Sequence, residues 1–248
     1  MAPADRPPPG VTHRFFLPSD SLASDDVSFP PDLSHQIARV LRLDPGDEVI
    51  VLDGSGVEAT VCLETVRPIA TGKVVARAPS VTEPATPVVL YMGLLKAAKL
   101  EMVLQKGTEI GLVGFVPMVT ARSVAGEPSA SRQKRFEAIV REAAEQSRRG
   151  MLPFVAPPIP FAEAVRSAAG TSLLLWEEEE QTHLMNAPLK EHPVSLFVGP
   201  EGGFTTEEAA LAREAGMQIV TLGPRILRAE TAGIVAGALL LARLGDLG

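Results

Sequence analysis

The sequence predicts an α/β protein in which a small β domain precedes a larger domain with a mostly parallel sheet. Three observations lead to this prediction. Short β-type runs separated by turn signals fill residues 13–80, a proline-rich segment follows, and apolar runs alternate with helical stretches over residues 88–248. Because the middle segment has three prolines within ten residues, residues 81–87 are predicted to form a stiff linker between the domains.

The first domain is predicted from three runs with the composition of strands: Glu48–Leu52, Glu58–Leu63 and Lys73–Ala78. Turn signals separate them, at Asp44-Pro-Gly-Asp47 and at Asp53-Gly-Ser-Gly56. Short strands at this spacing are typical of a small barrel or sandwich.

The second domain is predicted from strands that are apolar on both faces, which is typical of a parallel sheet covered by helices on each side. The expected strands are Val88–Leu94, Gly114–Met118, Ser172–Trp176, Val194–Val198 and Gln218–Leu222. The expected helices are Leu100–Ile110, Arg132–Arg148, Thr206–Ala215 and Ala229–Leu244. The acidic run Glu177–Glu180 is interpreted as a solvated loop or helix end.

Composition excludes several classes of protein. The 248 residues include 23 Lys and Arg against 30 Asp and Glu, and the resulting net charge of −7 argues at first against a nucleic-acid partner. Cys62 is the only cysteine and the four histidines lack metal-ligand spacing, so neither a disulfide nor a metal site is expected. The apolar stretch Ala232–Ala242 is shorter than the ~20 residues that a membrane span needs. Residues 1–12 are predicted to be a disordered, proline-rich extension and not a targeting signal, so we expect a cytoplasmic protein.

The sharpest local feature is the segment Leu196–Glu208. An apolar strand runs into Gly199-Pro-Glu-Gly-Gly203, and Thr205 with Glu208 has the spacing of a capping box that opens a helix. A strand, glycine loop and helix start in this order allow backbone N–H groups to approach a ligand closely. A plain tight turn is an equally good interpretation, because the glycines match neither the dinucleotide nor the P-loop spacing.

A second loop, Leu222–Ala232, also follows an apolar strand and leads into the last helix. Two such loops at the carboxyl ends of strands are where an α/β sheet builds its ligand crevice. Arg225, Arg228 and Glu230 lie between an apolar strand and an apolar helix, where charges are costly unless they are paired or used. A structural pair of Arg228 with Glu230 or with Glu201 is the alternative interpretation.

The two loops resemble the SPOUT superfamily of methyltransferases, and closely its RsmE type, which methylates N3 of a uridine in 16S ribosomal RNA. The resemblance rests on Gly199–Gly203 and Leu222–Ala232 and extends over most of the chain. It includes His13-Arg-Phe-Phe16 and three longer segments, residues 35–54, 96–122 and 142–149. Arg148 and Arg149 both fit the arginine of the last segment.

The resemblance implies a PUA-like RNA-binding barrel over residues 13–80 and, over residues 88–248, a SPOUT domain whose deep trefoil knot binds S-adenosylmethionine (SAM). It also implies a homodimer through the knotted domain. The glycines permit close main-chain approach, and the glycine loop lacks the lysine of a phosphate site, which suits a cationic sulfonium. The residues implied to bind SAM are Val198, Gly199, Pro200, Glu201, Gly202, Gly203, Leu222, Gly223, Ile226, Leu227, Arg228 and Thr231.

Methylation of N3 requires removal of its proton or stabilisation of the charge that develops on O2 or O4 of the uracil. We expect Arg228 to be the stabilising cation, and Glu201 or Glu230 to be the polar partner or the base. All three lie in the two loops that converge on the expected methyl group. The identity of the base stays open.

RNA contacts are expected from basic residues of both domains. The segment Lys96–Arg149 has 10 basic and 6 acidic residues and is therefore locally basic. The negative net charge of the whole chain is thus only a weak argument against RNA binding. Phe15 and Phe16 could stack on bases, although aromatic side chains more often fill a core. The expected partner is 16S rRNA, free or in the 30S subunit. The candidate contacts are Arg14, Arg39, Arg42, Lys96, Lys99, Lys106, Arg122, Arg148 and Arg149.

Other functions stay open. A SPOUT enzyme acting on another RNA or at a ribose oxygen would share the two loops, but residues 96–149 favour the RsmE type. A non-enzymatic RNA-binding ribosome-assembly factor could keep the fold, although intact cofactor loops argue against it. A dinucleotide-dependent oxidoreductase and a hydrolase are disfavoured because their motifs are absent from the sequence.

Overall fold

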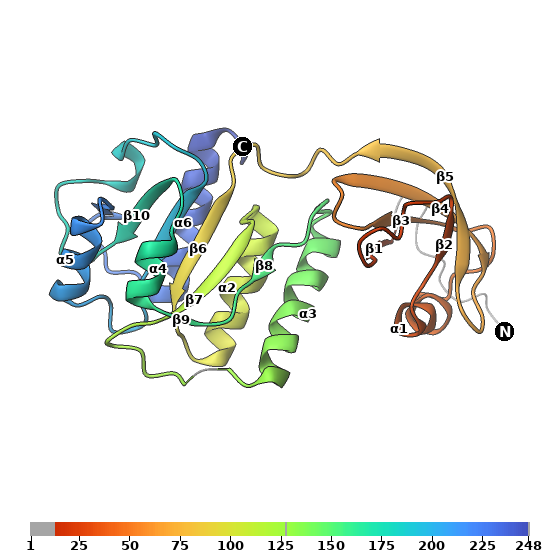
Figure 1. The fold of residues 1–248 in the computed structure, drawn as a ribbon, viewed down its shortest axis with the longest axis horizontal. Coiled ribbons are helices and arrows are strands. Elements are labelled where there is room, and N and C mark those ends of the chain that lie inside the picture. The colour runs from red at the N-terminus through yellow and green to blue at the C-terminus, as the bar shows by residue number, and fades with distance from the viewer. Residues whose placement is uncertain (1–12, 127, 248) are drawn as a thin grey trace. The chain divides into compact units, whose positions relative to one another are not determined.

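The computed structural model describes residues 13–126 and 128–247, which form two compact units (Figure 1). One unit extends along the chain to Glu83 and also contains Arg148–Leu152. The other contains Pro84–Ser147 and the chain from Pro153 onward. The extension expected over residues 1–12 lies outside the described residues.

The N-terminal unit is built on a five-stranded sheet of order β1-β3-β4-β5-β2. β1 runs parallel to β3, and the other neighbours are antiparallel. A short helix, α1 (Pro31–His35), continues directly into the π-helical turn η1 (Gln36–Val40). The strands are β1 (Arg14–Phe16), β2 (Asp26–Ser28), β3 (Glu48–Leu52), β4 (Val57–Thr65) and β5 (Thr71–Pro79).

The segment that follows β5 is fixed to the unit by Glu83. The carboxylate of Glu83 accepts hydrogen bonds from the Arg149 side chain and from the backbone N–H groups of Gly150 and Met151. Thr82 adds a hydrogen bond to the carbonyl oxygen of Arg148. This is why Arg148–Leu152 belongs to the N-terminal unit, although the sequence placed these residues within the second domain.

The larger unit contains a parallel sheet of order β12-β10-β11-β6-β7-β8, with β9 also paired to β7. All of its pairs are parallel, and β11 is buried along its whole length, so the α/β prediction is confirmed. The strands are β6 (Val88–Gly93), β7 (Gly114–Val119), β8 (Phe154–Val155), β9 (Ile159–Pro160), β10 (Thr171–Leu175), β11 (Val194–Val198) and β12 (Gln218–Val220).

Helices cover both faces of this sheet (Figure 1). One apolar core lies under α2 (Ala97–Ile110), α3 (Ala130–Gln146) and α6 (Ala229–Leu244). A second core lies under α4 (Phe161–Ser167) and α5 (Thr206–Glu214). A short 3-10 turn, η2 (Leu184–Asn186), follows β10. No helix of the described chain has the length and apolar character of a membrane span.

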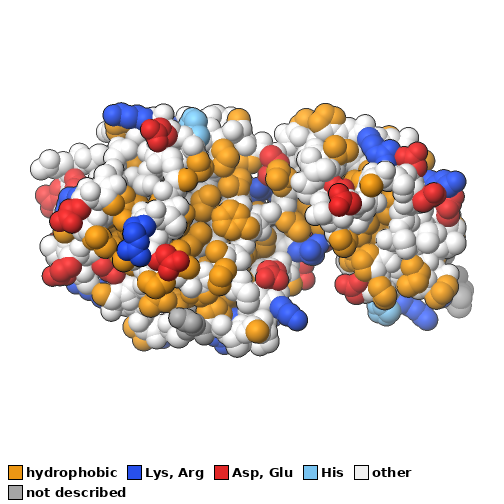
Figure 2. Space-filling view, in the orientation of Figure 1, with side chains coloured by type: hydrophobic (Ala, Val, Ile, Leu, Met, Phe, Trp, Pro, Cys, Tyr) orange, Lys and Arg blue, Asp and Glu red, His pale blue; other side chains and the backbone are white. Residues whose placement is uncertain are grey.

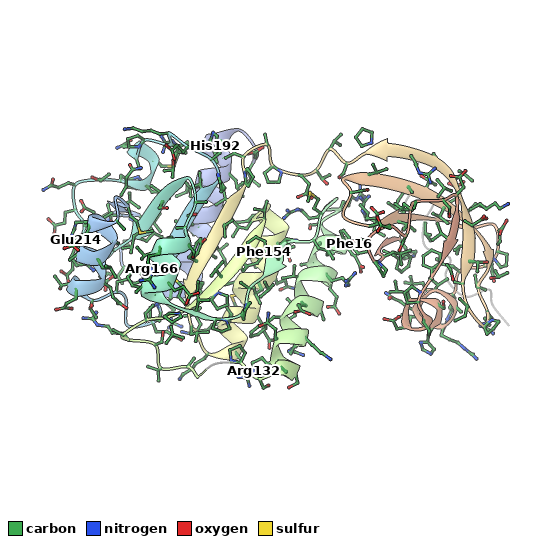
Figure 3. The ribbon with its side chains drawn as sticks, viewed as in Figure 1. Phe16, Arg132, Phe154, Arg166, His192 and Glu214 are labelled. Atoms are coloured by element: carbon green, nitrogen blue, oxygen red, sulfur yellow. The ribbon has the colours of Figure 1, made fainter. Side chains whose placement is uncertain are left out.

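Contacts at the β7 and β8 strands show how closely the sheet is packed. Phe154, labelled in Figure 3, is the register partner of Gly114, and a Cβ atom at Gly114 would overlap its ring. α4, β8 and β9 were not predicted, since each has seven residues or fewer and Pro157, Pro158 and Pro160 interrupt any periodicity there.

Candidate functional site

A cavity of about 930 Å³ lies at the carboxyl ends of β10, β11 and β12 in the larger unit. The two loops singled out in the sequence line it, and the segment after β10 lines it as a third wall. Lys99, from the first turns of α2, completes the lining. The position agrees with the general rule that α/β sheets bind ligands beyond the carboxyl ends of their strands.

The glycine loop after β11 closes on itself and then starts a helix. The N–H of Gly203 donates to the carbonyl oxygen of Pro200 at 2.9 Å. Gly203 has φ of +68°, a conformation that favours glycine, and a Cβ atom there would displace the Glu177 carboxylate. The predicted capping box is confirmed, because Thr205 Oγ1 accepts from Glu208 N at 3.2 Å and Glu208 Oε2 accepts from Thr205 N at 2.9 Å.

The loop after β12 forms the rim of the cavity. Gly223 has φ of +104°, and its N–H donates to Thr221 Oγ1 at 3.2 Å. Arg225 and Arg228 are exposed, and the Ile226 side chain, which also lines the cavity, is 86% exposed. Leu227 is half-buried against the cavity.

The main electrostatic feature of the site is a cluster of Lys99, Glu201 and Glu230. Lys99 Nζ lies 3.2 Å from Glu201 Oε1 and 3.4 Å from Glu230 Oε2. The side chain of Glu230 is 11% exposed, whereas those of Lys99 and Glu201 are about 30% exposed. Glu201 and Glu230 are therefore paired with Lys99, and not with Arg228 as in the alternative interpretation of the sequence.

This cluster fixes the ionisation of its members. The hydrogen bond from Lys99 to Glu201, aided by Glu230, raises the pKa of the Lys99 ammonium group in spite of partial burial. Burial raises the pKa of the Glu201 carboxyl, but hydrogen bonds from its own backbone amide and from Lys99 outweigh this effect, so the pKa lies below its usual value. At neutral pH Lys99 is therefore a cation and Glu201 a carboxylate, which makes Glu201 a weak proton acceptor.

Most of the residues expected to bind SAM line this cavity, with Thr231 as the exception. Thr231 is exposed and lies on α6 beyond the cavity wall. Glu230 reaches the site only through Lys99. The acidic run Glu177–Glu180 is not simply a solvated loop, because three of its glutamates line the cavity. Lys99, expected to contact RNA, lines the cavity instead. The lining residues that the sequence did not assign to the cofactor site also include Leu175, Trp176, Glu177, Glu179 and Glu180.

Two of the arginines expected to contact RNA are used inside the N-terminal unit. Arg14 is 11% exposed in its side chain and forms an ion pair with Glu58. Arg149 is 3% exposed and is paired with Glu83. Both assignments to RNA were wrong, since a buried and paired guanidinium is not available to a phosphate.

The two phenylalanines considered as possible stacking faces are core residues, which was the favoured interpretation of the sequence. Phe15 and Phe16, the latter labelled in Figure 3, are 1% and 3% exposed and fill the core of the N-terminal sheet.

The other RNA candidates are more accessible. Arg122 is exposed, and its Nη1 donates to the carbonyl oxygens of Gly202 and Phe204, so it supports the glycine loop. Lys106 pairs with Glu109 on the surface of α2. On the face shown in Figure 2, basic and acidic side chains are interspersed and form no continuous basic surface. The exposed candidates are Arg39, Arg42, Lys96, Lys106, Arg122 and Arg148.

No cluster of histidine, cysteine and acidic side chains able to hold a metal ion occurs within residues 13–126 and 128–247.

Comparison with known families gives two matches along the chain. Residues 82–241 match a family described as the RNA methyltransferase domain, and residues 30–69 match one described as the RNA methyltransferase PUA domain. The first match covers the whole larger sheet and both loops of the cavity.

Curated relatives match over nearly the full chain. Ribosomal RNA small subunit methyltransferase E of Synechocystis sp. is 35% identical over 94% of this chain and 78% of its own length. The protein of the same name from Bacillus subtilis is 30% identical and covers 88% of each chain.

Solved structures extend this similarity to the fold. The ribosomal RNA small subunit methyltransferase E of Neisseria gonorrhoeae, solved with S-adenosyl methionine bound, has a TM-score of 0.87 at 30% identity and covers 94% of this chain and 98% of its own. A Legionella pneumophila protein in complex with the bound cofactor SAM has a TM-score of 0.86 at 28% identity, over 94% of this chain and 98% of its own.

Proposed function

This chain belongs to the RNA methyltransferase family of ribosomal RNA small subunit methyltransferase E, and from that premise we propose that it methylates N3 of a uridine in 16S rRNA, using SAM. The observation that carries the proposal is the cavity at the carboxyl ends of β10, β11 and β12, which combines two glycine-containing loops with a fixed cluster of charges.

The residues of the cavity fit SAM. Gly203 and Gly223 adopt left-handed φ values that let the backbone approach a ligand, and Val198 and Leu227 offer apolar surface for an adenine. Glu177, Glu179, Glu180 and Glu201 supply negative charge near a cationic ligand. When bound there, the cofactor supplies an electrophilic methyl group.

The catalytic assignment follows from the charges around this cavity. We assign Glu201 and Glu230 the role of balancing the positive charge of Lys99. Glu201 is a weak base, because its pKa is lowered. Arg228 lies exposed on the rim, where it can contact an incoming RNA. The surrounding residues are also expected to position the uracil ring against the methyl group.

The proposal extends to the trefoil knot, the homodimer and the RNA-binding role of the N-terminal unit. The match to the PUA domain supports the PUA-like unit, and the likeness to a solved relative supports the fold of the larger unit, in which the knot is proposed. Arg39 and Arg42, both exposed in that unit, are the proposed phosphate contacts. Light scattering of the purified protein tests the homodimer, since a monomer mass would contradict it.

One experiment tests the function. The protein is incubated with labelled SAM and with 30S subunits from a strain that lacks the modification, and the methylated nucleotide is mapped. Methyl transfer to N3 of one uridine is the expected result. Label at a ribose oxygen or in another RNA would indicate a different SPOUT activity. Absence of both transfer and SAM binding by calorimetry would indicate a non-enzymatic assembly factor.

A further inference from the structure

Lys99 is a charged side chain of the cavity that the proposed function leaves without a role. It is contributed by α2, about 100 residues before either glycine-containing loop, yet its Nζ reaches Glu201 in one loop and Glu230 at the start of α6. A lysine ammonium group has three N–H donors. The two carboxylates lie at ion-pair distance and hold the ammonium group at the wall of the cavity, where it can donate an N–H to a ligand.

The position of Lys99 is fixed from two sides, in contrast to the other cations of the cavity. Arg225 and Arg228 are exposed on the rim, and no ion pair of either is found among the described residues. Preorganised donors stabilise a developing charge better than mobile ones, because no reorganisation is needed at the moment of reaction. Other titratable groups that line the cavity are Glu177, Glu179, Glu180 and His183.

We propose that the Lys99 ammonium group, held between Glu201 and Glu230, is the catalytic cation that stabilises the negative charge of the target base during methyl transfer, a role assigned from the sequence to Arg228. This inference rests on the proposed function. The uracil loses its N3 proton to solvent, and the remaining negative charge spreads over N3, O2 and O4. Lys99 donates an N–H to one of these oxygens and keeps its own proton throughout.

The electrons of the step balance without a further reactant. The N3 lone pair forms the new bond to the methyl carbon, the electrons of the broken carbon–sulfur bond remain on sulfur, and the methylated base leaves neutral. Lys99 therefore changes the ease of forming the uracil anion, and its removal raises the pH at which that anion forms.

The test compares Lys99→Gln and Lys99→Arg in the full-length protein. Lys99→Gln is expected to lower kcat at neutral pH by ~100-fold, the effect typical of losing one charge-stabilising donor. The rising limb of the pH–rate profile moves to higher pH, while SAM affinity measured by calorimetry stays at the wild-type value. Lys99→Arg restores part of the rate. Lys190→Gln, which removes an exposed lysine that does not line the cavity, is the matched control and leaves the rate and the SAM affinity unchanged.

A substrate with a more acidic N3 provides a readout that a structural role would not move. Small-subunit RNA transcribed with 5-fluorouridine and reassembled into subunits is expected to rescue Lys99→Gln more than it accelerates the wild type. An unshifted pH profile without selective rescue would overturn the inference, and so would loss of SAM binding by Lys99→Gln. If the wild-type protein transfers no methyl group, the proposed function itself fails, whatever the variants do.

Discussion

Arg149 forms a bidentate pair with Glu83, in which Nε donates to Oε1 at 2.9 Å and Nη2 donates to Oε2 at 2.6 Å. The guanidinium side chain is 3% exposed, and Glu83 Oε1 also accepts from the N–H of Gly150 at 2.8 Å. One carboxylate thus joins the end of the segment after β5 to a segment more than sixty residues later in the chain.

Removing this carboxylate should destabilise the protein. Glu83→Ala leaves a buried guanidinium without its main counter-charge, so we expect a loss of about 3 kcal/mol in the free energy of unfolding, measured in urea. Glu101→Ala is the matched control, because Glu101 forms an equally bidentate pair with Arg135, whose side chain is 65% exposed. Its cost should be below about 1 kcal/mol. Equal costs for the two variants would contradict this account.

The free energy of unfolding should also decrease in acid, because the Glu83 carboxylate becomes protonated. Burial raises the pKa of Glu83, but hydrogen bonds and charge attraction from Arg149 outweigh it and leave the pKa below 4.5, its ordinary value. A lowered folded pKa contributes stability that is complete above pH 4.5 and is lost as the pH falls through the folded value. The stability difference between wild type and Glu83→Gln should therefore shrink from pH 7 towards pH 3. A difference independent of pH would show that the carboxylate contributes no charge interaction.

The glycine loop can be tested with a matched pair of substitutions. Gly203→Ala and Gly216→Ala both place alanine at a left-handed φ, +68° and +82°. A Cβ at Gly203 overlaps the Glu177 carboxylate, whereas nothing lies within 4 Å of a Cβ at Gly216. Gly216→Ala should cost only the backbone strain, ~1 kcal/mol, and leave SAM affinity intact. Gly203→Ala should weaken SAM binding by ~10-fold, or ~1.4 kcal/mol, because the Glu177 carboxylate that lines the cavity must move away from the new methyl group.

A double variant identifies the cause of that loss. Adding Glu177→Ala removes the overlapping carboxylate, so Gly203→Ala should be less harmful in that background than in the wild type. Additive effects on SAM affinity would mean that the overlap is not the reason.

The start of α5 offers a further prediction. Thr205→Ala removes the hydroxyl that caps the helix and should cost about 1 kcal/mol of unfolding free energy. Glu208→Ala should cost more, because Glu208 accepts from Thr205 N and, through Oε1, from Ala121 N at 2.8 Å. Thermal or urea unfolding of the two variants checks the order, and a smaller loss for Glu208→Ala would refute it.

RNA affinity should depend on the exposed arginines of the N-terminal unit. Replacing Arg39 and Arg42 with alanine is expected to weaken binding and to reduce the dependence of log affinity on log salt by about 2, one for each phosphate contact. Filter binding between low and physiological salt measures the slope. An unchanged slope would place the phosphate contacts elsewhere.

Much of the larger unit was predictable because its elements are long and locally consistent. α6 and β11 begin and end at the predicted residues, Ala229–Leu244 and Val194–Val198, since apolar runs of that length are bounded by clear turn signals. Three-residue strands such as β1 and β2 carry no periodicity of their own. They form because partners distant in sequence supply their hydrogen bonds.

The cavity was predictable only in part, for a related reason. Its two loops follow strands and carry glycines that any reader of the sequence can find. Lys99 gives no such signal, because its partners Glu201 and Glu230 are more than 100 residues away in the chain. The acidic run Glu177–Glu180 could have been found, since it follows β10, a neighbour of β11 whose carboxyl end lies at the same edge of the sheet.

Because Arg148–Leu152 belongs to the N-terminal unit, that unit is discontinuous in sequence. A single cut of the chain near residue 83 cannot separate the units as folding entities: the N-terminal fragment would lack Arg149, and the C-terminal fragment would carry Arg149 without Glu83. Truncation at the proline-rich segment therefore yields two incomplete pieces. Separate study of RNA binding and methyl transfer is better made with point variants in the intact chain.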